Sequence, residues 1–246
     1  MENTVRKRFS WVVALILALS LVLSTSIATY GFVKSKARQN TVTVTGSAKK
    51  QIKSDLIVWK GSFSAQSPDI STAYNKLKKD MEKVTKYLTD SGIQEKDMKV
   101  NPITTIENRV VLPNGMMSSA VESYRLNQEI EVRSSEVDKI TDISRESTKL
   151  INDGVQFQSI PPQYFYTKIA DLKVDMLALA TEDARNRAQQ IAEKSGTQLK
   201  KLSSAKMGVF QITPLYSNEI SDYGINDTSS IEKEIMAVVN CVFETK

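Results

Sequence analysis

The chain has 246 residues, of which 41% are hydrophobic and 25% are charged, and it contains one cysteine and no histidine. This composition is typical of a globular protein rather than a disordered or collagen-like one. The lack of histidine excludes catalytic triads and metal sites that depend on imidazole, and a single cysteine excludes internal disulfides and cysteine-pair redox motifs. We therefore expect no catalytic residues, no cofactor and no metal site.

The positive charge is concentrated near the N-terminus. Of the 33 basic and 28 acidic residues, six basic residues and one acidic residue lie in residues 1–40, which leaves 27 of each sign in residues 41–246. The net charge of +5 therefore belongs to the first segment, and the rest of the chain is neutral. A neutral domain lacks the basic surface that binds a phosphate backbone, so we expect no nucleic-acid partner.

Residues 9–33 form an uncharged apolar segment. At about 1.5 Å per residue, a helix of this length can cross a hydrocarbon core of roughly 30 Å, with Trp11 and Tyr30 suited to the two interfaces. The segment is either a retained transmembrane anchor or a signal peptide that is cleaved near Ala28. The apolar run continues beyond that point to Val33, which favours the anchor.

The apolar segment also predicts how the chain is divided. We expect residues 1–8 to be a cytoplasmic tail, because so short a segment stays in the cytoplasm more easily than it crosses. Residues 34–40 are a polar linker, and residues 41–246 form a domain outside the cytoplasm, in the periplasm. Three basic residues precede the apolar segment and three follow it, so the positive-inside rule does not decide the orientation. The alternative is a soluble periplasmic domain released by cleavage.

Hydrophobic periodicity predicts two strands and a helix at the start of the domain. Residues 41–45 alternate as a half-buried strand does, residues 56–65 are a second strand candidate, and Gly61 suggests a bulge. Ser67 is predicted to cap a helix that ends at Gly92. Apolar residues recur in this helix at three- and four-residue spacing, so one of its faces should pack against a core.

A hairpin and a second helix follow. Residues 98–111 are extended, Asn114 and Gly115 predict a tight turn, and the return strand over 124–133 alternates between a buried face and a wet face. A capping-box pattern then opens a helix that stops at Gly154. The alternation indicates an antiparallel sheet with one side free.

A strand at 155–160, a long helix and two further strands complete the predicted elements. The helix spans about 168–195 and contains four alanines spaced four residues apart, which allows a neighbouring element to approach closely. Strands are predicted at 199–212 and 234–243, and the last is apolar on both faces, so it should be central, with Cys241 buried in it. The spaced alanines are Ala180, Ala184, Ala188 and Ala192.

The element order is β-β-α-β-β-α-β-α-β-β, preceded by one N-terminal transmembrane helix. Hairpins mixed with helices predict an α+β fold with mixed or antiparallel sheets and three helices, rather than a doubly wound parallel sheet. Both halves of the domain contain hairpins and a helix, which suggests a structural duplication. Residues 213–231 are too many for a simple hairpin, so they form either a mobile loop or a surface used in assembly.

Motifs for catalysis are few. The chain contains no phosphate-binding loop, dinucleotide fingerprint, nucleophile elbow or HExxH motif. Asp90, Ser91 and Gly92 match the short motif of aspartic proteases, but the motif occurs once and at a predicted helix end, whereas that chemistry needs two carboxylates. Glu129 and Glu131 share a strand face with basic neighbours, and we interpret them as a solvated surface.

Three stretches together carry a resemblance to a known family. They read VTVTGSAKKQIKSDLIVWKGSFSA, YRLNQEIEVRSSEVDKITDI and ALATEDARNRAQQIAEKSG. Over about residues 41–246 the chain resembles the SIMPL-domain family, bacterial envelope proteins catalogued as a domain of unknown function. The resemblance implies an extracytoplasmic α+β domain without an established catalytic site, in a family where some members form ring- or channel-like homo-oligomers and some are linked to oxidative-stress tolerance. It transfers no functional residues, and the uninterrupted anchor departs from the cleaved signal of many relatives.

The sequence thus predicts a non-enzymatic, membrane-anchored cell-envelope protein that self-assembles into a homo-oligomer through strand edges or residues 213–231. The homo-oligomer would be of the ring or channel kind and connected with envelope or oxidative-stress tolerance. An alternative is an adaptor or ligand-binding module that recruits an envelope partner protein through the same loop. A hydrolase based on carboxylates or lysine is a third hypothesis.

Overall fold

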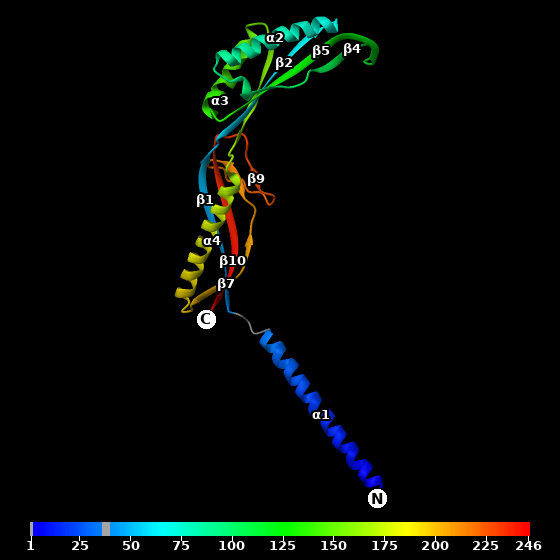
Figure 1. Ribbon diagram of the computed structural model, residues 1–246, viewed down its shortest axis with the longest axis vertical. Coiled ribbons are helices and arrows are strands. Elements are labelled where there is room, and N and C mark those ends of the chain that lie inside the picture. The colour runs from blue at the N-terminus through cyan, green and yellow to red at the C-terminus, as the bar shows by residue number, and fades with distance from the viewer. Residues whose placement is uncertain (1, 36–39) are drawn as a thin grey trace. The chain divides into compact units, whose positions relative to one another are not determined.

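The computed structural model describes residues 2–35 and 40–246 (Figure 1). Part of the predicted linker, residues 36–39, therefore lies outside the described residues. The chain divides into two compact units, a smaller one of residues 1–44, 188–204 and 242–246 and a larger one of residues 45–187 and 205–241.

The smaller unit contains helix α1 (Glu2–Ser35). Its stretch Leu15–Phe32 is uncharged, unburied, and the one helical stretch in the described residues that is long and apolar enough to cross a membrane. This property fits both a membrane anchor and a signal sequence. In the same unit, the amide of Thr245 donates to the carbonyl of Asn40 at 2.8 Å, which pairs the two ends of the domain.

In the larger unit, five strands form a sheet that we call the β2–β5 sheet. It consists of β2 (Leu56–Ser67), β3 (Met98–Val100), β4 (Thr104–Val111), β5 (Met117–Ser134) and β6 (Gln156–Phe165). The order is β3-β5-β2-β6, with β4 also paired to β5, and every pairing is antiparallel. Helices α2 (Ile70–Asp90) and α3 (Val137–Glu146) pack on this sheet (Figure 1).

The core of this layer is apolar and fully enclosed. Trp59 and Phe63 of β2 have almost no exposed surface, and the stripe predicted on the first domain helix points into the same cluster. Each large buried side chain contributes about 1.5–3 kcal/mol to folding relative to an exposed one. The buried members of the α2 stripe are Ala73, Leu77, Val84 and Leu88.

The other five strands form a second sheet, the β1–β10 sheet. It consists of β1 (Thr41–Lys53), β7 (Leu199–Met207), β8 (Gln211–Pro214), β9 (Ile225–Asn226) and β10 (Glu232–Thr245). The order is β1-β10-β8-β9, with β7 also paired to β10, so β10 is central as predicted. Cys241 is fully buried in it, also as predicted. Only Ser54 and Asp55 separate β1 from β2, although the two strands belong to different sheets.

Helix α4 (Ile169–Lys194) carries the row of spaced alanines, and all four are buried. At Gly46 of β1, an added Cβ would lie 2.1 Å from the carbonyl oxygen of Ala180 and 2.4 Å from the amide nitrogen of Ala184. Only glycine allows the strand backbone to approach the helix backbone this closely. The amide of Ser47 then donates to the Asp183 carboxylate at 2.9 Å, so the contact is polar as well as close.

The observed architecture confirms the predicted fold class, an α+β arrangement of mixed and antiparallel sheets with three helices after an N-terminal apolar helix. The element order also repeats: β2, α2, the interrupted β3–β4 and long β5 correspond to β6, α4, the interrupted β7–β8 and long β10. Both interruptions differ from the sequence prediction, which placed single strands at 98–111 and 199–212. Pro102 lies in the first gap, where it cannot donate a ladder hydrogen bond.

Several local predictions were wrong in detail. Asp69, not Ser67, caps α2, and its carboxylate accepts from the Thr72 amide at 2.7 Å. Helix α3 begins without a side-chain cap, so the predicted capping box does not form. The register shift in β2 lies between Val58 and Lys60 rather than at Gly61.

Gly61 serves another purpose in the β2–β5 sheet. An added Cβ at this position would lie 2.5 Å from Cζ of Phe157 on β6. The missing side chain therefore leaves the space that the Phe157 ring occupies, next to Trp59, whose ring centre is 6.4 Å from that of Phe157. The predicted bulge residue is thus a packing site for an aromatic ring.

Candidate functional site

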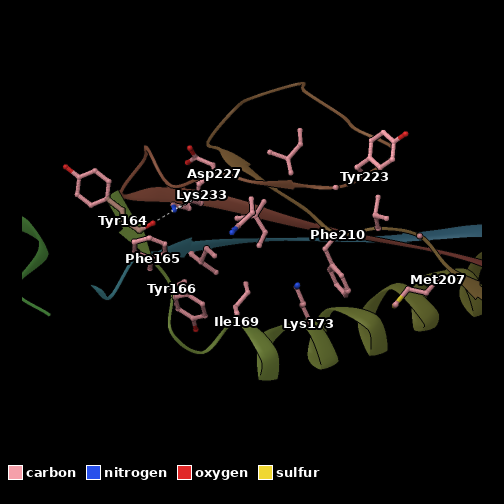
Figure 2. A pocket seen from close by; sticks show the side chains of 17 residues that line it. Tyr164, Phe165, Tyr166, Ile169, Lys173, Met207, Phe210, Tyr223, Asp227 and Lys233 are labelled. Carbon is pink, nitrogen blue, oxygen red and sulfur yellow. Dashed lines mark hydrogen bonds between the residues drawn. The ribbon is translucent and has the colours of Figure 1, made fainter. Parts of the chain in front are cut away.

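A cavity of about 630 Å³ lies in the larger unit, where the end of β6 and the start of α4 face β8 and β9 (Figure 2). This volume falls within the range of small-molecule sites, roughly 300–1,000 Å³. Most of the lining is aromatic or aliphatic, as in such sites. The apolar lining includes Ile52, Phe165, Tyr166, Ile169, Phe210 and Ile212.

Lys233 lines the cavity from β10 and is only 2% exposed. Its ammonium donates to the backbone carbonyl of Tyr164 at 2.7 Å and to the backbone carbonyl of Asp227. Burial lowers the pKa of Lys233, although the nearby charge of Asp227 acts in the opposite direction. Because the two carbonyls belong to β6 and to the segment after β9, this one side chain ties three parts of the chain together.

Asp227 also lines the cavity, but its carboxylate is engaged by its own loop. It accepts hydrogen bonds from the amide of Ser229 at 2.9 Å, from the hydroxyl of Ser229 at 2.6 Å and from the amide of Ser230 at 3.2 Å. Burial by itself would raise the pKa of Asp227, but these hydrogen bonds and the charge of Lys233 lower it. Asp227 is therefore an ionised group that offsets the charge of Lys233.

Lys173 is the third charged residue in the lining, half-buried on the first turns of α4. Its ammonium lies 5.4 Å from the centre of the Phe210 ring, a cation–π distance. Among residues 2–35 and 40–246, no carboxylate lies within ion-pair distance of it. The helix positions three and four residues away are all apolar, namely Ile169, Ala170, Met176 and Leu177. Lys173 thus gives the cavity a positive charge that is not part of an ion pair with any carboxylate of the described residues.

The segment 213–231 borders the cavity, and part of it is regular structure. Residues 225–226 form β9, which pairs in parallel with β8. The carbonyls of Thr228 and Ile231 accept hydrogen bonds from Tyr164 and Ser54, both at 2.8 Å. The prediction of a loop is therefore wrong for the second half of the segment, which is held by the backbone of both sheets.

The middle of this segment instead exposes three large side chains. Tyr223 is 97% exposed and stands at the edge of the cavity, where its ring points away from α4 (Figure 2). The exposed side chains are Tyr216, Ile220 and Tyr223.

The hairpin of β4 and β5 forms a second surface of interest. Strand β2 pairs with β5 only as far as Tyr124, so beyond this residue β4 and β5 continue as a two-stranded ribbon (Figure 1). Val111 and Met117 face each other across this ribbon and are 62% and 76% exposed. Its turn is the predicted one, with Gly115 in the left-handed region at φ 79°. We call the exposed apolar residues of this ribbon and its turn the hairpin patch; they are Val110, Val111, Leu112, Met116 and Met117.

The residues that the motif analysis singled out do not meet in one site. Asp90 pairs with Lys86 at 2.7 Å at the end of α2, and Gly92 follows with φ 83°, so the Asp-Ser-Gly match is a helix end. Glu131 is only 8% exposed, which makes the predicted solvated face wrong at that position. It is held at 2.7 Å by Arg133 and at 3.7 Å by Lys60, and the hydrogen bond from Arg133 lowers its pKa despite burial.

Within the described residues, no group of three or more histidine, cysteine, aspartate or glutamate side chains is placed to hold a metal ion. The cavity residues were not predicted from sequence, because they come together only through the sheet pairing. One signal was present: Lys233 is in phase with the buried residues Ile235, Ala237 and Val239 of the same strand. A lysine on the buried face of a strand indicates a charged group enclosed by the fold.

Comparison with known proteins places the chain in a family. A family model described as SIMPL, protein of unknown function (DUF541), matches residues 42–243. The comparison with curated proteins finds no match. The family match spans both sheets and all three helices of the domain. The chain therefore belongs to the SIMPL family.

Proposed function

We propose that this chain is a non-enzymatic cell-envelope protein, anchored by α1 in the membrane, whose domain self-assembles outside the cytoplasm into a homo-oligomer of the ring or channel kind. The single observation that carries the proposal is the hairpin patch on the β4–β5 ribbon. A role in envelope or oxidative-stress tolerance follows only from the resemblance to family members with that role.

The ribbon has the properties of a surface that a second copy would cover. A two-stranded ribbon without a covering layer is at best marginally stable in water, and strand β4 has β5 as its only partner among the described strands. Natural proteins usually protect such an edge with charges, proline or a bulge. Strand β4 has such protection in its middle, where Glu107 and Arg109 form an ion pair and the register shifts on both sides of Arg109. Beyond Arg109 the strand ends in apolar residues, and exposed clusters of this kind favour protein contacts.

The non-enzymatic part of the proposal rests on the side-chain chemistry. The chain contains no histidine. The buried Lys233 uses its ammonium to hold two backbone carbonyls, which is a structural use. A hydrolase needs a nucleophile beside a base. The buried polar groups described above, Glu131, Asp227 and Lys233, instead have structural partners.

Self-association can be tested on the full-length chain in detergent by size-exclusion chromatography with light scattering. The double variant V111K/M117K places two charges in the centre of the hairpin patch, and V174K places one on α4 at a residue that is 68% exposed. We expect the parent and V174K to form the same oligomer. We expect the V111K/M117K oligomer to dissociate at protein concentrations at least tenfold higher than those at which the parent oligomer dissociates. Each apolar side chain buried in the interface contributes about 1.5–3 kcal/mol. A parent chain that is monomeric at high concentration, or a double variant that assembles normally, contradicts the proposal.

An adaptor function is the second candidate, favoured by the exposed Tyr216, Ile220 and Tyr223 in the middle of segment 213–231. Aromatic residues are enriched where proteins bind one another. Replacing the three with serine should abolish binding to an envelope partner and leave the oligomer intact. Loss of the oligomer without loss of a partner would instead place self-association in this segment.

A further inference from the structure

We propose that the cavity beside Lys173 binds a small amphipathic anion, a molecule with one acidic head group and an unbranched or aromatic apolar body. The inference goes beyond the proposed assembly, because the cavity and the hairpin patch are built from different residues. Its class of ligand follows from the charge, the lining and the volume of the cavity.

The acidic head group follows from the charges in the lining. Asp227 offsets Lys233 and accepts three hydrogen bonds from Ser229 and Ser230. Lys173 has no carboxylate partner in the described part of the chain, and its ammonium faces Phe210 in the cavity (Figure 2). The lining therefore has a net charge of one positive unit at Lys173, which an anion would neutralise through a charge-assisted hydrogen bond.

The apolar body follows from the remaining lining. Ile169 lies one helical turn before Lys173 on the same face of α4, and Ile212 of β8 and Phe210, the residue before β8, also line the cavity. These side chains provide an apolar surface next to the ammonium, so one ligand can contact both. A cavity of about 630 Å³ accommodates a small ligand of this kind.

Hydrogen bonds within the chain hold the walls of the cavity in place. The ammonium of Lys233 fixes the walls by holding the carbonyls of Tyr164 and Asp227. The amide of Asp227 donates to the Ile212 carbonyl at 2.9 Å. A site whose walls are already fixed loses little conformational entropy when a ligand enters.

The test uses the full-length chain in phosphatidylcholine nanodiscs and a decanoic acid derivative that carries a diazirine photo-crosslinker. We expect ultraviolet light to attach the probe to peptides that contain residues 164–173 or 207–227, and unlabelled decanoate to compete. Decyltrimethylammonium, which has a similar apolar chain and the opposite charge, should compete at least tenfold less well. Phosphatidylcholine is zwitterionic, so decanoate and its photoreactive derivative are the acidic amphiphiles in this experiment. A parallel experiment uses nanodiscs that contain the acidic lipid phosphatidylglycerol. This lipid should reduce labelling by the probe only if the acidic ligand comes from the membrane.

Three variants locate the head group and the apolar body. K173Q should weaken competition by decanoate roughly tenfold, the contribution of one hydrogen bond between charged groups, and leave competition by decanol within twofold. I169W should fill the cavity and reduce labelling by all probes. K78Q, at an exposed lysine of α2, and V174W, on the exposed face of α4, are the matched controls and should bind as the parent does.

Circular dichroism and hydrogen exchange of each variant separate loss of binding from loss of folding. Labelling confined to α1, equal competition by decanoate and decyltrimethylammonium, or full binding by both K173Q and I169W would overturn the inference. Because V111K/M117K leaves the cavity residues unchanged, it should bind decanoate normally, so failure of the assembly proposal and failure of this one are distinguishable.

Discussion

The contact between Gly46 of β1 and helix α4 allows a quantitative prediction. In a G46A variant, the new Cβ would lie 2.1 Å from the Ala180 carbonyl oxygen and 2.4 Å from the Ala184 amide nitrogen, whereas ordinary contacts of a Cβ begin at 3.4 Å. Both atoms belong to the helix backbone and cannot rotate away. The strand must therefore move by about 1 Å, which costs roughly 1–3 kcal/mol in a packed interior.

The same movement weakens a hydrogen bond. The amide of Ser47 donates to Asp183 at 2.9 Å, and this bond is the largest cause of the lowered pKa of Asp183. Together the two effects should reduce the free energy of unfolding by about 2–4 kcal/mol, which lowers the melting temperature by roughly 5–15 °C for a domain of this size. The pKa of Asp183 should rise toward the ordinary value for aspartate.

The assay is urea unfolding of the full-length chain in detergent, followed by far-ultraviolet circular dichroism, with hydrogen exchange to localise the change to β1 and α4. G208A is the matched control, because its added Cβ would lie 3.3 Å from the Val238 carbonyl oxygen, close to an ordinary contact. We expect G208A to change the stability by less than about 1 kcal/mol. A G46A protein as stable as G208A, with an unchanged pKa at Asp183, would refute the reasoning.

Two further predictions concern the β2–β5 sheet. G61A should destabilise the protein by roughly 1–3 kcal/mol because its Cβ would overlap the Phe157 ring. Adding F157L to the G61A chain should recover part of this loss of stability, measured by urea unfolding. If no stability is recovered, the strain lies elsewhere. E131Q should lower the free energy of unfolding at pH 7 by on the order of 1 kcal/mol, because it removes the ion pairs with Arg133 and Lys60. The folded pKa of Glu131 is lowered, so its stabilisation is complete above the unfolded pKa of about 4.3 and is lost as the pH falls through the folded pKa. Unfolding measured from pH 7 to pH 3 should therefore show the parent and E131Q converging, and a constant difference would contradict this assignment.

The elements that were predictable from sequence are those defined by local patterns. The apolar stripe of α2, the alternation in β5 and the row of alanines in α4 depend on spacing along one segment, and each element is present in the structure. Their side chains are buried because the spacing matches the helix or strand period. The helix end at Gly92 and the turn at Gly115 were also predictable from local sequence. Glycine adopts positive φ more readily than other residues, and both glycines have positive φ.

Features that depend on strand pairing could not be predicted in this way. Glu131 looked like a surface residue, but the register places it opposite Lys60 on β2 and Lys99 on β3, so it is enclosed among charges from two other strands. The cavity has the same origin, because Lys173 of α4 and Phe210, the residue before β8, lie 37 positions apart in the chain and meet only in the folded structure. A periodic pattern predicts on which face of a helix or strand a residue lies, but it does not predict which residues of adjacent strands lie next to it.

The short link between β1 and β2 has a mechanical consequence. Strands β1 and β10 run in opposite directions, since Lys49 pairs with Glu234 at 2.8 Å and Thr45 with Asn240 at 2.6 Å. A pulling force transmitted from α1 to Asn40 would act along β1. It would load the hydrogen bonds between β1 and β10 in shear, so that many of them must break together. Because β1 continues into β2 after Ser54 and Asp55, the pull would reach the second sheet without passing through a long elastic loop.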